Sequence, residues 1–112
     1  MRKLIALYHH PENTDRFRKH VEQIHLPLVA RFPGLRAMRH GFGVGSSTEV
    51  SPYYAIVECE FDDEAAMNRA LSSPEGAAAA ADVPNYATAG VTILTVAIEP
   101  ALACERFERI DQ

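Results

Sequence analysis

Two histidines and a proline share one short segment whose apolar residues repeat with helical spacing. His20 and His25 are five residues apart, and Pro27 follows two residues later. Histidine suits general acid–base chemistry because its ordinary pKa lies closest to neutral pH. A proline inside a helix removes a backbone N–H donor and leaves a carbonyl oxygen without its partner. A helix that holds all three residues is either built around a site or tolerates an irregularity.

The position of these histidines on the expected helix leaves two interpretations open. The core-facing stripe has 4-3-4 spacing and consists of Phe17, Val21, Ile24 and Leu28. At roughly 100° per residue, His20 and His25 fall on opposite borders of that stripe, and their spacing does not suit a metal pair on one helix face. His25 is therefore either a partly exposed residue at the margin of the core or a residue at the mouth of a cavity beside Pro27.

The totals for the chain indicate one compact domain over residues 1–112, of which 47% are hydrophobic. A net charge of −4 and the lack of a dense basic run argue against nucleic acid as a partner. No apolar run reaches the roughly 18 residues of a membrane span, and the apolar start of the chain is too short for a signal peptide. We therefore expect a cytoplasmic protein. Cys59 and Cys104 lack CxxC spacing and predict free thiols.

The expected elements alternate in the order βαββαβ, which is the ferredoxin-like arrangement of the α+β class. Strands are expected over 3–8, 35–43, 53–61 and 90–98. Helices are expected over 14–31, from Asp62 or Asp63 to Leu71, over 74–82, and as a short segment after Pro100, with a loop over 83–86. The four strands would form one antiparallel sheet, and both crossovers would place their helices on the same face.

The other face of that sheet needs a partner, because strands 3–8 and 90–98 are apolar on both sides. The simplest solution is a homodimer in which two open sheet faces meet. Along strand 53–61, Tyr54, Ile56, Glu58 and Glu60 should face this open side. Glu58 is mid-strand, and it either pairs with Arg36 or Arg39 or projects into the interior as a functional carboxylate.

A series of short segments occurs in a fixed order along the chain: residues 3–8, His25-Leu26-Pro27-Leu28, Pro33-Gly34-Leu35-Arg36, 52–56, Phe61-Asp62-Asp63, Ser73-Pro74-Glu75-Gly76 with the alanine run to Asp82, and 85–88. In this order and spacing, the segments resemble the EthD family of dimeric α+β barrel proteins. The resemblance implies a ferredoxin-like protomer and a dimeric barrel. Members are often labelled oxidoreductases, but this chain has no dinucleotide fingerprint or flavin motif, so no cofactor is expected.

These observations predict a small cofactor-free enzyme that acts on an aromatic, lactone or polyketide-like molecule by acid–base chemistry. His25 and Glu58 would be catalytic, in a cavity between the His25 segment and the open sheet face. The expected contacts to substrate are Tyr8, His40, Tyr54 and Tyr86. No metal or haem is expected. The alternatives are a non-catalytic binding or accessory protein that uses the same pocket, and a purely structural dimer.

Overall fold

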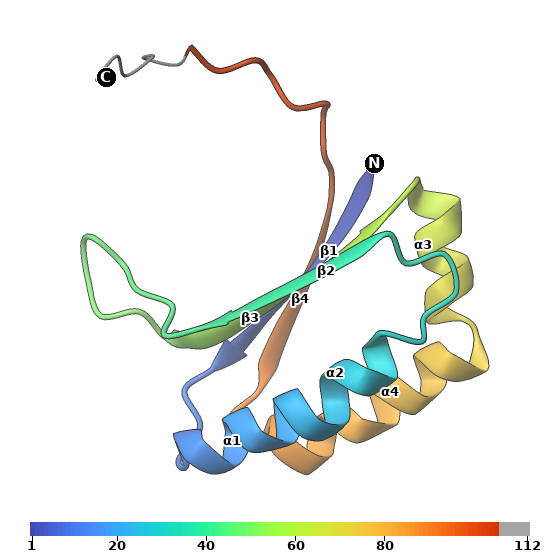
Figure 1. The fold of residues 1–112 in the computed structure, drawn as a ribbon. Coiled ribbons are helices and arrows are strands. Elements are labelled where there is room, and N and C mark those ends of the chain that lie inside the picture. The colour runs from blue at the N-terminus through green and yellow to red at the C-terminus, as the bar shows by residue number, and fades with distance from the viewer. Residues whose placement is uncertain (106–112) are drawn as a thin grey trace, which may run out of the picture.

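The structure is a computed structural model that describes residues 1–105 (Figure 1). The strands are β1 (Arg2–His9), β2 (Ala37–Phe42), β3 (Tyr53–Phe61) and β4 (Val91–Ala97). The helical elements are α1 (Thr14–His20), the π-helical segment η1 (Val21–His25), α2 (Leu26–Val29), α3 (Glu64–Leu71) and α4 (Pro74–Tyr86). The expected order is confirmed, and strand ends differ from prediction by two residues at most. Residues 101–105 are not helical, and the rest of the helix expected after Pro100 lies outside the described residues.

The four strands form one antiparallel sheet in the order β2-β3-β1-β4. Strand β1 is central and pairs with both β3 and β4, so that Ala6 lies opposite Val57 on one side and Ile93 on the other. All helices of the described residues pack on one face of the sheet (Figure 1). This arrangement is the predicted α+β architecture, and it places the helical layer directly over β1 and β3.

The first helix, expected over 14–31, is irregular in its middle. Helix α1 begins after Asn13, whose side-chain oxygen accepts a hydrogen bond from the Arg16 N–H at 2.9 Å. Within η1 the Leu26 N–H donates to the Val21 carbonyl, five residues back instead of four. Pro27 has no N–H to maintain the α-helical pattern at this place, which favours the wider turn. The helix expected over 14–31 is therefore present as far as Val29, and the irregularity that the proline suggested is a π turn at η1.

The wide turn also changes which residues face the core. Val21 is buried as expected, but Ile24 is 47% exposed and His25 is only 4% exposed. A π turn contains about one residue more than an α turn, so the residue that returns to a given face comes five places later, not four. The expected stripe therefore loses Ile24 and gains His25, which is fully part of the core layer and not at its border.

The second crossover positions the end of α4 beside η1. Helix α3 is capped by Asp63 and α4 by Ser73, each through a side-chain oxygen that accepts a backbone N–H. The predicted helix end at Asp82 is wrong, because α4 continues through Pro84 to Tyr86, and the Ala87 N–H still reaches the Val83 carbonyl at 2.9 Å. Asp82 and Tyr86 therefore lie one turn apart on the same helix face.

The core fills the space between the helices and one face of the sheet. Its buried members include Ala6, Tyr8, Phe17, Val21, Val29, Val57, Cys59, Phe61, Met67 and Ala70. The opposite face carries Ile5, Leu7, Ile56, Leu94 and Val96, because side chains alternate along a strand. Leu94 is 48% exposed and Val96 39% exposed. This open apolar face matches the expectation from the sequence.

Candidate active site

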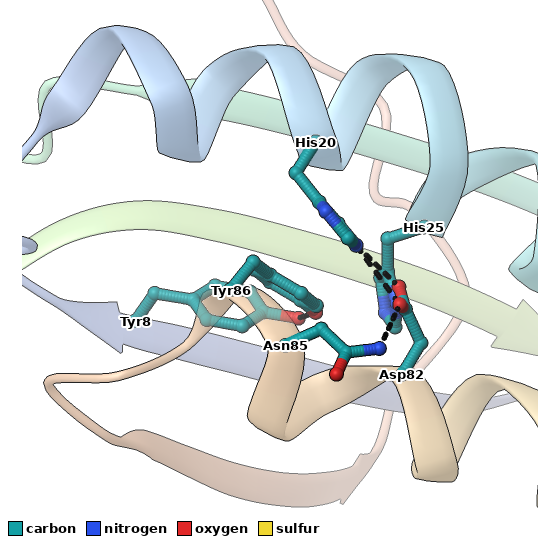
Figure 2. Close-up of polar contacts among 6 residues, drawn as sticks. All are labelled: Tyr8, His20, His25, Asp82, Asn85 and Tyr86. Atoms are coloured by element: carbon teal, nitrogen blue, oxygen red, sulfur yellow. Dashed lines mark hydrogen bonds and ion pairs between the residues drawn. The ribbon is translucent and has the colours of Figure 1, made fainter.

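The centre of the candidate site is the carboxylate of Asp82 on α4, which two histidines from the first helix contact (Figure 2). His20 Nε2 lies 2.9 Å from Oδ1 and 3.0 Å from Oδ2, and His25 Nδ1 lies 3.1 Å from Oδ2. The Asn85 amide donates to Oδ1 at 3.0 Å. Asp82 and His25 are buried, at 6% and 4% exposure. The carboxylate thus receives hydrogen bonds from three side chains inside the fold.

The π-helical segment is what makes both histidines reach one carboxylate. In a regular α-helix, residues five apart point in clearly different directions. Across η1 that spacing brings His20 and His25 to the same side, as Figure 2 shows. Single π turns inside α-helices occur frequently at functional sites. The inference from sequence that these histidines occupy opposite borders is therefore wrong, because it assumed α-helical geometry.

Two tyrosines complete the cluster. The hydroxyl groups of Tyr8 on β1 and Tyr86 on α4 lie 2.7 Å apart. The Tyr86 ring stacks on His20 with a centroid separation of 5.0 Å, and its centroid lies 4.7 Å from that of His25. Tyr86 therefore fixes the orientation of both imidazoles, while its hydroxyl fixes that of Tyr8.

Burial and hydrogen bonding set the charge states of this cluster. Burial lowers the pKa of His25 below 6.5, because apolar surroundings disfavour the imidazolium, although the Asp82 hydrogen bond opposes this. Burial would raise the pKa of Asp82, but the hydrogen bonds from Asn85, His20 and His25 outweigh it, and the pKa is lowered. His25 is therefore a neutral base near neutral pH. Since Nδ1 faces the carboxylate, we assign its proton to Nδ1.

An apolar cavity of about 360 Å³ lies between the sheet and the helices, and His25 and Tyr8 line it. Its other walls are almost entirely aliphatic and include Val29, Val57, Ala79 and Val83. Burial raises the pKa of Tyr8, so its hydroxyl group stays protonated. The volume falls within the range of small-molecule sites. With Nδ1 of His25 bound to Asp82, Nε2 is the nitrogen left for a molecule in this cavity.

A second, polar cavity of about 470 Å³ lies between the start of the first helix and the end of α4. His20 and Tyr86 line this cavity, together with Arg16, Asn85 and Thr88. The histidine pair therefore spans two cavities, because His25 lines the apolar cavity and His20 lines the polar cavity.

Comparison with known proteins identifies the family. The model of the EthD domain matches residues 9–90, which is most of the chain. The chain belongs to the EthD family. A protein of Rhodococcus erythropolis, described as an uncharacterized 11.0 kDa protein in the thcB-thcC intergenic region, is 36% identical over 96 residues, covering 84% of this chain and 91% of that protein.

Solved structures confirm the ferredoxin-like fold of this EthD domain. The crystal structure of an ethyl tert-butyl ether D (EthD) family protein from Bacillus halodurans is 34% identical, with a TM-score of 0.82 over 88% of this chain and 99% of that chain. A dimeric ferredoxin-like protein of unknown function from Thermobifida fusca is 21% identical, with a TM-score of 0.66 over 87% of this chain and 90% of that chain. At that identity the second likeness concerns the fold alone.

Three of the residues predicted for the site come together in the EthD domain. His25, Tyr8 and Tyr86 meet on the helical side of the sheet. The site thus lies beneath the helices, and the predicted position at the open sheet face is wrong. The helices cover the face that carries Tyr8, and the open face is the opposite one.

Glu58 does not join this group, and its expected position within reach of His25 is wrong. Because Val57 and Cys59 are buried on the helical side, Glu58 points to the open face. Its partner is the Lys3 ammonium at 3.2 Å, and not Arg36 or Arg39. Arg36 pairs instead with Asp62 at 3.3 Å, and Arg39 pairs with Glu60 at 2.7 Å.

Tyr54 and His40 also lie elsewhere. The pairing of β1 with β3 shifts register between Tyr8 and His9, and the Tyr54 ring packs on the helical side, with its centroid 5.8 Å from that of Phe17. The expectation that Tyr54 faces the open side is therefore wrong. His40 is exposed on β2, with its ring 5.5 Å from Phe42, and lines neither cavity described above.

The site residues that sequence reasoning missed are Asp82, Asn85 and the paired role of His20. A signal for Asp82 was present, because it is the one charged residue in the helix after Glu75. Gly76, Ala79 and Asp82 follow 3-3 spacing, so the carboxylate lies on the buried face. A buried carboxylate requires partners, and histidines are suitable ones.

The donor set of the site does not indicate a metal centre. In the part of the chain that the structure describes, no three His, Cys, Asp or Glu side chains are arranged to hold a metal ion.

None of the helices of residues 1–105 has both the length and the apolar composition needed to cross a membrane.

Proposed function

We propose that this EthD-family protein is a cofactor-independent enzyme that deprotonates a small, mostly apolar carbonyl compound in the apolar cavity. The observation that carries the proposal is the hydrogen bond between His25 Nδ1 and Asp82 Oδ2 at 3.1 Å, made by a histidine that lines this cavity. A neutral imidazole held by a buried carboxylate is a base of defined orientation. Aromatic, lactone and polyketide-like molecules are the substrate classes that such a cavity suits.

The proposed reaction begins with transfer of a proton from the carbon beside the carbonyl group to His25 Nε2. Asp82 stabilises the resulting imidazolium through Nδ1–H and is a positioning residue. The electrons of the broken C–H bond form an enolate, whose oxygen needs a hydrogen-bond donor. Tyr8 supplies it when Tyr86 donates to the Tyr8 oxygen, because the Tyr8 O–H is then directed to the cavity. Return of the proton from His25 to another carbon of a conjugated enolate completes an isomerisation. Alternatively, the enolate carbon attacks a second carbonyl, whose oxygen takes up the proton from His25, and this completes a cyclisation.

The test is hydrogen–deuterium exchange at carbon in D2O, which needs no knowledge of the product. A panel of lactones, aryl ketones and short polyketide mimics is incubated with the protein, and exchange is followed by NMR. The His25→Gln variant should lose at least about 100-fold in exchange rate on any compound that responds. The control is His40→Gln, whose exposed ring lines neither cavity and which should leave the rate unchanged. Equal rates in wild type and His25→Gln would refute the proposed chemistry.

A second candidate function is binding without catalysis, as an accessory protein would do. The observation in its favour is the hydrogen bond between Tyr8 and Tyr86, because two hydroxyl groups that satisfy each other leave a cavity with few groups for chemistry. In that case compounds of the panel bind, His25→Gln weakens their affinity, and no exchange at carbon is detected in either protein.

We also propose that two chains pair through their open sheet faces, as expected from the sequence. The support is the group of apolar side chains on that face, among them the half-exposed Leu94 of the edge strand β4. The Thermobifida fusca protein of the same fold is described as dimeric. The proposed location in the cytoplasm and the single-domain organisation of residues 1–112 stay predictions from the sequence.

A further inference from the structure

The exposed cationic side chain of Arg16 lines the polar cavity. Arg16 and His20 are four residues apart, so they lie on the same face of α1 and both line the cavity. In the described part of the chain, the arginines found in ion pairs are Arg2, Arg36 and Arg39, and Arg16 is not among them. A guanidinium that lines a cavity without a carboxylate partner is free to bind an anion.

The remaining groups of the polar cavity fit an anion with a polar body. Asn85 and Thr88 line the wall opposite α1. The charge of Asp82 behind this wall is already satisfied by hydrogen bonds from His20, His25 and Asn85. Glu12 is the only carboxylate among the lining residues, which also include the two basic side chains Arg16 and His20.

We propose that the polar cavity is a second ligand site, which binds a small organic carboxylate. The planar guanidinium of Arg16 matches the two oxygens of a carboxylate. His20 contacts Asp82 through Nε2, so Nδ1 is the ring nitrogen left for a polar group of a ligand in this cavity. The volume of about 470 Å³ accommodates a molecule the size of a substituted benzoate. This site is separate from the apolar cavity, so the proposal of a second ligand site does not depend on the proposed enzyme activity.

The probes are benzoate, benzamide and benzamidinium, which have the same shape but carry negative, no and positive charge. Each is titrated into the full-length ¹⁵N-labelled protein, and backbone amide shifts are followed by NMR. Benzoate should give saturable shifts at Arg16, His20 and Thr88, with an affinity at least about tenfold higher than that of benzamide. Benzamidinium should bind more weakly than benzamide. The Arg16→Gln variant should lose about tenfold in benzoate affinity.

The matched control is Arg18→Gln, which removes the same charge from the same helix. The Arg18 guanidinium lies 4.6 Å from the centre of the Phe42 ring and does not line the polar cavity. Benzoate affinity should therefore be unchanged in this variant. The proposal is overturned if benzamidinium binds more tightly than benzoate, if the two arginine variants weaken benzoate equally, or if the shifts map to Val29, Ala79 and Ile93 around the apolar cavity.

Discussion

Asp82 Oδ2 lies 3.1 Å from His25 Nδ1, although 57 residues separate the two in sequence. The contact joins α4 to the π-helical segment of the first helix, and it fixes the tautomer and the orientation of the buried imidazole. This relationship turns an otherwise ordinary core histidine into a candidate base that faces the apolar cavity.

Asp82→Asn should reduce both stability and any catalytic exchange. The amide cannot accept from both histidines and Asn85 as the carboxylate does, so buried donors lose their partner at a cost of about 1–3 kcal/mol in the free energy of unfolding. Urea denaturation measures this change. The control is Glu58→Gln on the opposite face, whose half-buried pair with Lys3 should contribute no more than about 1 kcal/mol. Equal effects of the two variants would contradict the central role of Asp82.

The free energy of unfolding should fall as the pH is lowered from neutral. The folded-state pKa of His25 lies below its ordinary value of 6.5, so the unfolded chain takes up the proton first. The neutral buried imidazole makes its full contribution to the free energy of unfolding above pH 6.5, and this contribution is lost as the pH falls from 6.5 toward the folded-state pKa. The lowered pKa of Asp82 places its own contribution in the more acidic range below 3.8.

Urea denaturation at about pH 7.5 and about pH 5 tests this pH dependence. The decline in stability between these conditions should be smaller in His25→Gln than in wild type. His40→Gln is the control, because its exposed ring on β2 should leave the decline as it is. A decline of the same size in His25→Gln and wild type would assign the pH dependence to other groups.

Deletion of Gln23 should be tolerated and should leave both histidines on Asp82. The exposed Gln23 lies inside η1, and removing one residue converts the wide turn into an α-helical turn, in which His20 and His25 become neighbours four residues apart. Deletion of the exposed Lys19 is the control, because it keeps the spacing of the two histidines but rotates the part of α1 before it, with the buried Phe17, out of register with the core, and it should therefore cost more stability. Imidazole NMR signals report on the contacts, and the Gln23 deletion should change the melting temperature by less than about 8 °C.

Leu94→Glu should break the proposed homodimer without unfolding the protomer. The side chain is 48% exposed on the open sheet face, where it lies opposite Ile5. Size-exclusion chromatography with light scattering should give twice the chain mass for wild type and the single chain mass for the variant. Ile24→Glu changes a residue of nearly equal exposure, 47%, on the helical layer and should stay dimeric. A monomeric wild type at micromolar concentration would remove the pairing proposal.

The element order was predictable because it depends on local periodicity and on capping residues. The alternation in β3 correctly assigned Val57 and Cys59 to the buried side. Three features were not predictable from periodicity and capping alone. The π turn depends on how the chain accommodates Pro27, the register shift beside Tyr8 moved Tyr54 to the helical side, and the pairing of Asp82 with His25 depends on how α4 packs on η1.

Glu58 and Asp82 are both carboxylates within regular elements, but their surroundings differ. Glu58 is a charged residue inside a strand, but helices cover only one face of that strand, so a charge on the other face can be exposed to solvent. Asp82 lies among alanines on a helix face that the fold buries, and a charge there must find partners within the core. Asp82 was therefore the stronger signal of a functional site, because its charge cannot be exposed to solvent from a buried helix face.

Cys59 offers a way to observe the apolar cavity without a known substrate. Its thiol is 2% exposed and lines that cavity, and burial raises its pKa to about 11, so little of the reactive thiolate forms at neutral pH. Alkylation of Cys59 is consequently limited by transient opening of the helical layer, while the exposed Cys104 reacts at once and serves as an internal reference. Any compound that occupies the cavity should slow the labelling of Cys59 relative to Cys104. The labelling rate of this buried residue can therefore be used to screen for ligands.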